Sequence, residues 1–369
     1  MMDENHKNHD SALKVNDGIE PPESVNQTAI ERFKKVKKAL LPSEDYFRGI
    51  VQGNRILLSQ AITLTESVHP SHQVLAQEVI EKCLPFSGKS VRIGITGVPG
   101  VGKSTFIEAL GKYVTSAGHK LAVLAIDPSS SRTKGSILGD KTRMEELSTD
   151  ENAFIRPSPS AGSLGGVARK TRESIILCEA AGFDVIFVET VGVGQSETAV
   201  YSMVDFFLLL MLAGAGDELQ GIKRGIMEMA DSIFINKADG DNVLKASQAR
   251  AEYRNALHLF PPAPSGWVPT VGTCSARTKE GIDQVWQTIQ QYIAFTHENG
   301  YFTEKRQEQK RLIMLEAVKE SLLSDFYSNP DIKKLVLELE AHLLDNKISS
   351  YIAAQKLMKH YFETKKTSH

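Results

Sequence analysis

The hydrophobic pattern changes along the chain and indicates where helices and strands lie. From Val91 to about Phe295, short apolar runs rich in β-branched residues alternate with longer segments of helical periodicity. Most of these runs are almost continuously apolar, as expected for strands covered by helices on both faces. Seven strands are predicted, at residues 91–97, 120–127, 153–157, 183–190, 205–212, 232–238 and 268–276. Such alternation predicts an α/β fold with a mostly parallel central sheet flanked by helices.

Helical periodicity without strands flanks this α/β region on both sides. The amino-terminal side is predicted to form three helices, at residues 29–41, 43–67 and 71–84. We expect Ser43 and Ser71 to be the N-caps of the last two, because a serine hydroxyl can accept from the unpaired N–H groups of a helix start. The carboxyl-terminal side is predicted to form three more helices, at residues 304–327, 330–345 and 349–366.

These changes of pattern predict four regions. They are a flexible tail at 1–27, an N-terminal helical region at 28–88, the α/β domain at 89–297 and a C-terminal helical region at 298–369. The tail is polar and lacks periodicity, which is typical of flexible termini. In the C-terminal region, Leu335, Leu339 and Leu343 form an apolar stripe. Such a stripe is expected to pack on its own chain, and a partner helix or a second copy is the alternative.

Composition narrows the class of protein. The formal net charge is only −2, so no global basic field favours nucleic acid or an anionic membrane as a partner. Cys83, Cys178 and Cys274 are far apart and form no CxxC pair, which favours buried thiols in a reducing compartment. The apolar run from Phe206 is too short to span a bilayer. The polar, acid-containing start lacks the features of a signal or transit peptide, so we expect a cytoplasmic location.

The segment GITGVPGVGKST, which begins at Gly94, contains a phosphate-binding motif. The pattern GxxxxGK[ST] is matched by Gly97, Val98, Pro99, Gly100, Val101, Gly102, Lys103 and Ser104, and Thr105 follows. Glycines let the backbone N–H groups face a phosphate, and the helix that follows adds its positive end. We expect Lys103 to reach the β- and γ-phosphates and Ser104 to ligate Mg²⁺. The preceding apolar strand and the following helix distinguish this motif from a chance match.

A second motif predicts which nucleotide base the site binds. Asn236, Lys237 and Asp239 form the NKxD pattern of GTP-binding proteins at the end of a predicted strand. A carboxylate at Asp239 can accept from guanine N1–H and N2–H₂, a donor pair that adenine lacks. We expect Lys237 to lie along the base and Asn236 to tie this loop to the phosphate loop. By itself the pattern also fits a strand-end turn.

A further strand end adds to the guanine prediction. Ser275, Ala276 and Arg277 resemble the SA loop whose backbone N–H contacts guanine O6, and this loop follows the base motif in the expected order. The sequence therefore predicts a site for GTP or GDP.

Carboxylates at two other strand ends are candidates for metal binding and catalysis. Asp127 and Glu189 end predicted strands, and ligands bind at the carboxyl ends of parallel strands. With Asp140 and Ser104 they are our candidate Mg²⁺ ligands, directly or through water. The expected catalytic residues are Lys103, Asp127 and Glu189. The alternative for Asp140 and its neighbour Arg143 is that they cap a surface helix.

Glycine-rich loops at the same edge are candidate switches. They cover residues 158–167 and 213–225, and such loops suit a response to the γ-phosphate. Gln195 lies three residues beyond Gly192, unlike the water-positioning glutamine of Ras. The sequence therefore predicts slow intrinsic hydrolysis that a partner accelerates.

Together, these segments carry a family resemblance. The quoted phosphate loop, GSILGDKTRM, SPSAGSLGGVARKT, VETVGVGQSE, GAGDELQGIKRGIMEMAD, NKAD and TCSA occur in one order, and the chain resembles the MeaB/ArgK/MMAA family from about Tyr46 to Phe295. This family belongs to the metallochaperone branch of the SIMIBI-class P-loop GTPases, and its Walker B glutamate matches Glu189. The resemblance implies that Asp217 and Lys223 belong to a switch that responds to nucleotide.

The resemblance also implies a function and an assembly. It implies a homodimeric GTPase chaperone that binds adenosylcobalamin-dependent methylmalonyl-CoA mutase, gates cofactor loading and release, and protects the mutase from inactivation. The C-terminal helices would then be the dimerisation arm. Related acyl-CoA mutases are possible clients, and neither nucleic acid nor a membrane is expected as a partner.

Two other functions compete with this one. The first is a GTPase metallochaperone for another metalloenzyme, which would normally carry a His-rich tract or a cysteine pair. Here the histidines of the tail and near the site are scattered, at His6, His9, His69, His72 and His119. The second is a nucleotide-dependent binding module whose hydrolysis is incidental, which the sequence leaves open.

Overall fold

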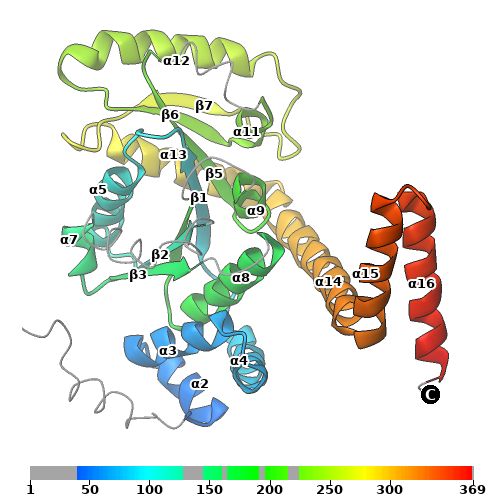
Figure 1. Ribbon diagram of the computed structural model, residues 1–369. Coiled ribbons are helices and arrows are strands. Elements are labelled where there is room, and N and C mark those ends of the chain that lie inside the picture. Colours follow the sequence, from blue (N-terminus) through cyan, green and yellow to red (C-terminus); the bar gives the residue numbers. More distant parts are fainter. Residues whose placement is uncertain (1–39, 128–143, 160–163, 191–195, 215–223, 368–369) are drawn as a thin grey trace, which may run out of the picture. The chain divides into compact units, whose positions relative to one another are not determined.

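Figure 1 shows a computed structural model of the chain, which describes residues 40–127, 144–159, 164–190, 196–214 and 224–367. By compactness the chain divides into Met1–Pro42 and Ser43–His369. Of the first unit, only residues 40–42 are described. All the helices and strands discussed below belong to the second unit.

A seven-stranded sheet forms the centre of the second unit. Its strands are β1 (Val91–Gly97), β2 (Leu121–Asp127), β3 (Ala153–Pro159), β4 (Val185–Thr190), β5 (Phe206–Leu212), β6 (Ser232–Asn236) and β7 (Thr270–Thr273). They are ordered β3-β2-β4-β1-β5-β6-β7, and every neighbouring pair is parallel. The predicted α/β fold with a parallel sheet is confirmed. A strand occurs at each of the seven predicted runs, and β3 extends two residues beyond its run, to Pro159.

Helices cover both faces of this sheet and continue beyond it (Figure 1). Among those that follow the strands are α5 (Lys103–Ser116), α7 (Glu145–Ser148), α8 (Leu164–Ala180), α9 (Ser196–Tyr201), α11 (Arg224–Met229), α12 (Val243–Leu257) and α13 (Ile282–Glu298). The amino-terminal helices are α2 (Ser43–Val51), α3 (Arg55–Glu66) and α4 (Pro70–Cys83). The carboxyl-terminal helices are α14 (Tyr301–Ser328), α15 (Pro330–Leu344) and α16 (Ser350–Thr367). Short 3₁₀ turns occur at η1 (Leu84–Phe86) and η2 (Gly240–Asn242).

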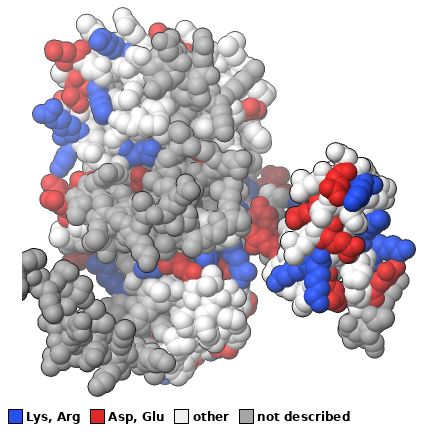
Figure 2. Space-filling model, in the orientation of Figure 1, with Lys and Arg blue, Asp and Glu red and all other residues white. Residues whose placement is uncertain are grey.

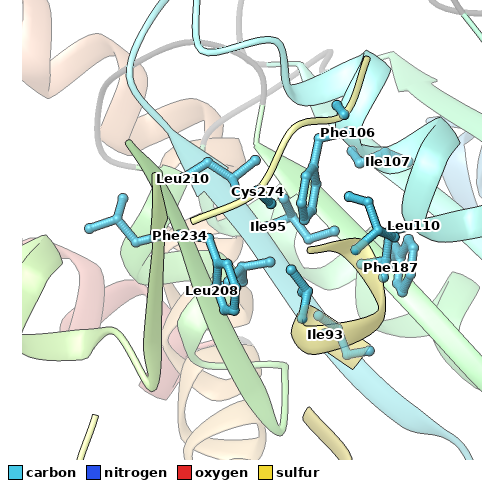
Figure 3. Close-up of a cluster of buried hydrophobic side chains, with 14 of the residues drawn as sticks. Ile93, Ile95, Phe106, Ile107, Leu110, Phe187, Leu208, Leu210, Phe234 and Cys274 are labelled. Carbon is cyan, nitrogen blue, oxygen red and sulfur yellow. The ribbon is translucent and has the colours of Figure 1, made fainter. Parts of the chain in front are cut away.

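Alternate residues of the central strands enter two different cores. Ile93 and Ile95 of β1 belong to the cluster that includes α5, where Figure 3 shows Ile95 beside Phe106. Ile186 and Val188 of β4 belong to the cluster on the other face, which includes side chains of α3, α4, α8 and α9. This double burial explains why the strand sequences are continuously apolar.

One predicted helix is in fact two. The run 43–67 was expected to be continuous, but α2 ends at Val51 and α3 begins at Arg55. Gly53 has φ +78°, a left-handed conformation that interrupts a helix. Asn54 then caps α3, because its side chain accepts from the N–H groups of Ile56 and Leu57.

The predicted cap of the next helix is also wrong. The helix α4 begins at Pro70, with His69 as N-cap residue and without a side-chain cap. Ser71 lies inside the first turn, where its hydroxyl contacts His69 Nδ1 at 2.8 Å. Proline is favoured at a first helical position because its missing N–H would be unpaired there anyway.

The helix α14 is fixed to the amino-terminal ends of the strands. Arg306 donates to both carboxylate oxygens of Asp205, at 2.8 and 2.7 Å, and to the carbonyl oxygens of Gly88 and Ser90. Gln309 donates to the carbonyl oxygen of Val204 at 2.9 Å. The segment before β5 is therefore held by α14.

Candidate nucleotide-binding site

The phosphate loop connects β1 to α5 at the carboxyl edge of the sheet. A side chain at Gly97 would place its Cβ 2.6 Å from the carbonyl oxygen of Leu210 in the neighbouring strand, so only glycine fits there. Gly100 and Gly102 have φ of +75° and +87°, values that side chains rarely tolerate. Each motif glycine thus meets a backbone requirement. Val98 and Val101 are buried beneath the loop, whereas Pro99 is exposed.

Lys103 is the first residue of α5, and its ammonium group folds back over the loop. Lys103 Nζ donates to the carbonyl oxygen of Gly97 at 3.0 Å. Burial lowers the pKa of Lys103, while the nearby carboxylates of Glu189 and Glu197 act in the opposite direction. Ser104 and Thr105 follow in the first turn, with Ser104 partly buried and Thr105 exposed.

The NKxD loop is tied to the phosphate loop through Asn236, which is buried at the end of β6. Its side-chain Nδ2 donates to the carbonyl oxygen of Val101 at 2.8 Å. Its Oδ1 accepts from the N–H of Ala276 at 3.1 Å. One amide thus joins the phosphate loop, the end of β6 and the loop after β7.

The other residues of the base motif are more accessible than the buried Asn236: Lys237 is exposed and Asp239 is partly buried. Lys237 has φ +60°, and its Nζ donates to the carbonyl oxygen of Gly100 at 2.7 Å. Ser275 Oγ donates to Asp239 Oδ2 at 2.5 Å and accepts from the N–H of Thr278 at 3.1 Å. The carboxylate is therefore held in place before any base arrives. Arg277 is exposed at the rim of this loop.

Two of the four candidate metal ligands have described side chains. Glu189 is buried near the end of β4 and is paired in register with Ile95 of β1. Ser104 lies in the first turn of α5, which follows β1. Asp127 ends β2, next to β4, but its side chain is outside the described part, as is all of Asp140. Carboxylate and hydroxyl oxygens of this kind fit Mg²⁺.

The candidate switch residues lie outside the described ranges. These are Arg143, Gln195, Asp217 and Lys223. Within the described residues no group of three or more His, Cys, Asp or Glu side chains could hold a metal ion.

Glu197 is a site residue that the sequence analysis did not assign. It lies in the first turn of α9, is 2% exposed, and acts electrostatically on Lys103. The signal was present in the quoted segment VETVGVGQSE. Glu197, Val200 and Val204 follow at spacings of three and four, which predicts one buried helix face that includes a carboxylate.

Comparison with known proteins agrees with this geometry. Residues 58–331 match the family model described as methylmalonyl Co-A mutase-associated GTPase MeaB. The chain belongs to this family. It is therefore a P-loop GTPase, and the resemblance drawn from its motifs is confirmed.

Individual members of the family are similar over most of the chain. GTPase ArgK of Escherichia coli is 46% identical over 310 residues, covering 84% of this chain and 94% of that protein. The methylmalonic aciduria type A homolog of Mus musculus, named as mitochondrial, is 47% identical over 323 residues. The match covers 85% of this chain and 78% of that protein. A crystal structure titled LAO/AO transport system kinase is 39% identical with a TM-score of 0.71, covering 88% of this chain and 99% of that one.

Proposed function

We propose that this GTPase assists adenosylcobalamin-dependent methylmalonyl-CoA mutase by gating cofactor loading and release and by protecting the mutase from inactivation. The match to the mutase-associated GTPase family over residues 58–331 carries the proposal. The relative named for methylmalonic aciduria adds support. We place this activity in the cytoplasm, where free thiols such as the buried Cys83, Cys178 and Cys274 persist. Across the described ranges, no helix is both long enough and apolar enough to cross a bilayer.

The proposed chemistry assigns a role to each group of residues. Lys103 leaves the carbonyl of Gly97 and binds the β- and γ-phosphates, while the loop amides of residues 97–105 surround the phosphate chain. Asp239 accepts from guanine, Lys237 lies along the base, and the loop of Ser275, Ala276 and Arg277 lies at O6. Ser104 and Glu189, with Asp127 and Asp140, would hold Mg²⁺. A bound Mg²⁺ supplies positive charge that neutralises the phosphates.

We assign the signal that reaches the mutase to the four candidate switch residues named from the sequence. Arg143, Gln195, Asp217 and Lys223 respond to the γ-phosphate in this proposal. Lys223→Ala should leave basal GTP hydrolysis within about twofold of the parent but abolish its stimulation by the mutase. Stimulation equal to that of the parent would remove Lys223 from the switch.

The C-terminal helices are proposed to form the dimerisation arm. A groove of about 340 Å³ between α14 and α16 is lined by apolar side chains, among them Leu323, Phe326, Met358 and Phe362. Leu323 and Phe362 are more than half exposed. Figure 2 shows acidic and basic side chains interspersed over α15 and α16, the helices that follow α14. An exposed apolar patch with a charged rim is typical of a protein interface.

The dimer can be tested by light scattering. Leu323→Glu places a charge in the groove and should convert a dimer to a monomer. The control Leu244→Glu changes an even more exposed leucine on α12 and should leave the mass unchanged. A parent chain that is monomeric at micromolar concentration would contradict the proposed arm.

The function itself is tested by cofactor transfer. Adenosylcobalamin is presented to purified apo-mutase with this protein and GTP, with GDP, or with the Lys103→Ala variant, and bound cofactor is followed by its absorbance. Loading that depends on GTP and fails with Lys103→Ala supports the proposal. Loading that is equal in all three would mean that the GTPase step is dispensable and that the chain is a binding module with incidental hydrolysis.

A further inference from the structure

The base loop holds one residue in a conformation that side chains rarely adopt. Lys237, which follows β6, has φ +60°, in the left-handed region. Its side chain reaches back to the phosphate loop, where Nζ donates to the carbonyl oxygen of Gly100 at 2.7 Å. A Cβ at Gly102 would lie 3.8 Å from Lys237 Cε. The left-handed turn thus directs the lysine stem toward the glycine loop, and such a conformation persists only where neighbouring groups hold it.

Asn242 supplies one of these holding contacts. Its side-chain Nδ2 donates to the carbonyl oxygen of Lys237 at 2.7 Å. Its backbone N–H donates to the carbonyl oxygen of Asp239 at 3.1 Å. On the other side of the loop, the N–H of Ala238 donates to the carbonyl oxygen of Cys274 at 3.0 Å. The chain from Lys237 to Asn242 therefore closes on itself, and one side-chain amide spans the closure.

The same amide does not serve the helix that begins beside it. Asn242 is the N-cap residue of α12, a position where asparagine commonly accepts from a helix N–H. Here its φ of −90° and ψ of −8° are helical, and its side chain makes no cap bond. The side chain is directed to Lys237 instead. A role in the base loop therefore explains this asparagine better than a role in starting α12.

We propose that Asn242 is a positioning residue for guanine, which holds the left-handed backbone of Lys237 so that the lysine stem lies along the base. Without this bond Lys237 relaxes toward negative φ, and its stem moves away from the glycine loop and the base. The phosphate loop keeps its own hydrogen bond, from Asn236 to Val101, so the phosphate contacts should not change. The inference rests on the guanine site of the proposed function and not on the identity of the client.

The test compares GDP with tripolyphosphate, which has the phosphates of a nucleotide but no base. Both compete with a fluorescent GDP analogue, and the readout is the ratio of their inhibition constants. Asn242→Asp keeps the shape and the capping ability of the side chain but removes the donor. It should weaken GDP binding about tenfold and leave tripolyphosphate binding within about threefold of the parent. Asn255→Asp adds the same charge at an exposed site on α12 and should change neither constant.

A second background shows whether Asn242 acts through the backbone of Lys237. Glycine adopts a positive φ without strain, so in a Lys237→Gly background the effect of Asn242→Asp on GDP binding should shrink to about twofold. Parental GDP affinity in Asn242→Asp, an equal loss for both ligands, or the full tenfold loss in the glycine background would overturn the proposed role. A parent that binds tripolyphosphate but not GDP would instead contradict the guanine assignment, so the two failures are distinguishable.

Discussion

The two edges of the central sheet both carry buried charged groups, but their bonding differs. At the amino edge, Glu179 accepts from Gly88 N, Ser90 Oγ and Arg92 at 2.6–3.0 Å, and Asp205 accepts from Arg92 N and Arg306. Each of these carboxylates is compensated by an arginine that is part of the fold. At the carboxyl edge, Lys103 instead bonds to a loop carbonyl.

This difference separates stabilisation from function. A carboxylate whose oxygens already accept hydrogen bonds from protein donors has no acceptor site left for a ligand. The carboxylates of the amino edge therefore serve to fix α14 and α8 to the sheet. At the carboxyl edge, the side chains of Lys103 and Lys237 donate to carbonyls of the glycine loop, which a phosphate chain can replace. Changes at the amino edge should therefore alter the free energy of unfolding, and changes at the carboxyl edge should alter nucleotide binding.

The largest effect is expected for Arg306→Ala at the amino edge. The change leaves Asp205 buried with part of its charge uncompensated, which should lower the free energy of unfolding by about 3–5 kcal/mol. Urea unfolding measures it. Arg311→Ala on the same helix removes an exposed ion pair with Glu308 and should stay within about 1 kcal/mol of the parent. Equal losses for both variants would contradict the special position of Arg306.

A second effect at the amino edge depends on pH. Burial raises the pKa of Asp231 to about 6, although Lys305 and the N–H of Phe207 favour its charged form. Because the folded pKa lies above the unfolded one, the stability from Asp231 is fully present below about pH 4 and lost as pH rises through about 6. The loss should reach about 3 kcal/mol.

Asp231→Asn removes this titration. Between pH 4 and pH 7 the variant should gain about 3 kcal/mol relative to the parent in urea unfolding, whatever its stability at a single pH. Asp241→Asn, an exposed change, should follow the pH dependence of the parent. A constant difference between Asp231→Asn and the parent would show that Asp231 is charged in both states across this range.

At the carboxyl edge, Asp239→Asn should change base choice. An amide cannot accept from both guanine donors as a carboxylate does, so the preference for GTP over ATP should fall about tenfold to a hundredfold. Competition binding measures the ratio of the GTP and ATP affinities. The affinity for ATP should stay within about threefold of the parent, because the phosphate loop is intact. An unchanged ratio would contradict the role of Asp239 in selecting guanine.

The smallest effect is expected for Ser275→Ala. The hydroxyl holds Asp239 through a 2.5 Å bond, and losing one such bond should weaken GDP binding about fivefold. Stability should change little, because Asp239 is only partly buried. Ser247→Ala, an exposed change on α12, should leave both quantities unaltered. GDP affinity equal to that of the parent would show that Asp239 needs no support.

The sequence predicted the sheet and the loops of the carboxyl edge because their signals are local. The apolar runs of the strands and the spacing from Gly97 to Ser104 lie within a few residues, and the structure places the strands where the runs occur. Asn236 was expected to tie the base loop to the phosphate loop, and its hydrogen bond to Val101 is present. Local backbone chemistry at Gly53 and Asn54, which splits one helix in two, was overlooked although its residue types were visible.

The amino edge could not be predicted in this way. Arg306 and Asp205 are 101 positions apart, and Arg92 and Glu179 are 87 apart. No local spacing relates such residues, since the sheet order brings them together. Glu197 lies between these cases. Its burial follows from helical spacing, but the packing of α9 against Gly94 of β1 depends on the order of the sheet.

The central claim is that GTP hydrolysis at this site serves a mutase. The direct measurement is the rate of GTP hydrolysis with and without purified methylmalonyl-CoA mutase, with ATP as the control nucleotide. We predict slow GTP turnover that rises at least about tenfold on addition of the mutase, and negligible ATP turnover with or without it. GTP turnover that is indifferent to the mutase would contradict the proposed client while leaving the nucleotide site intact.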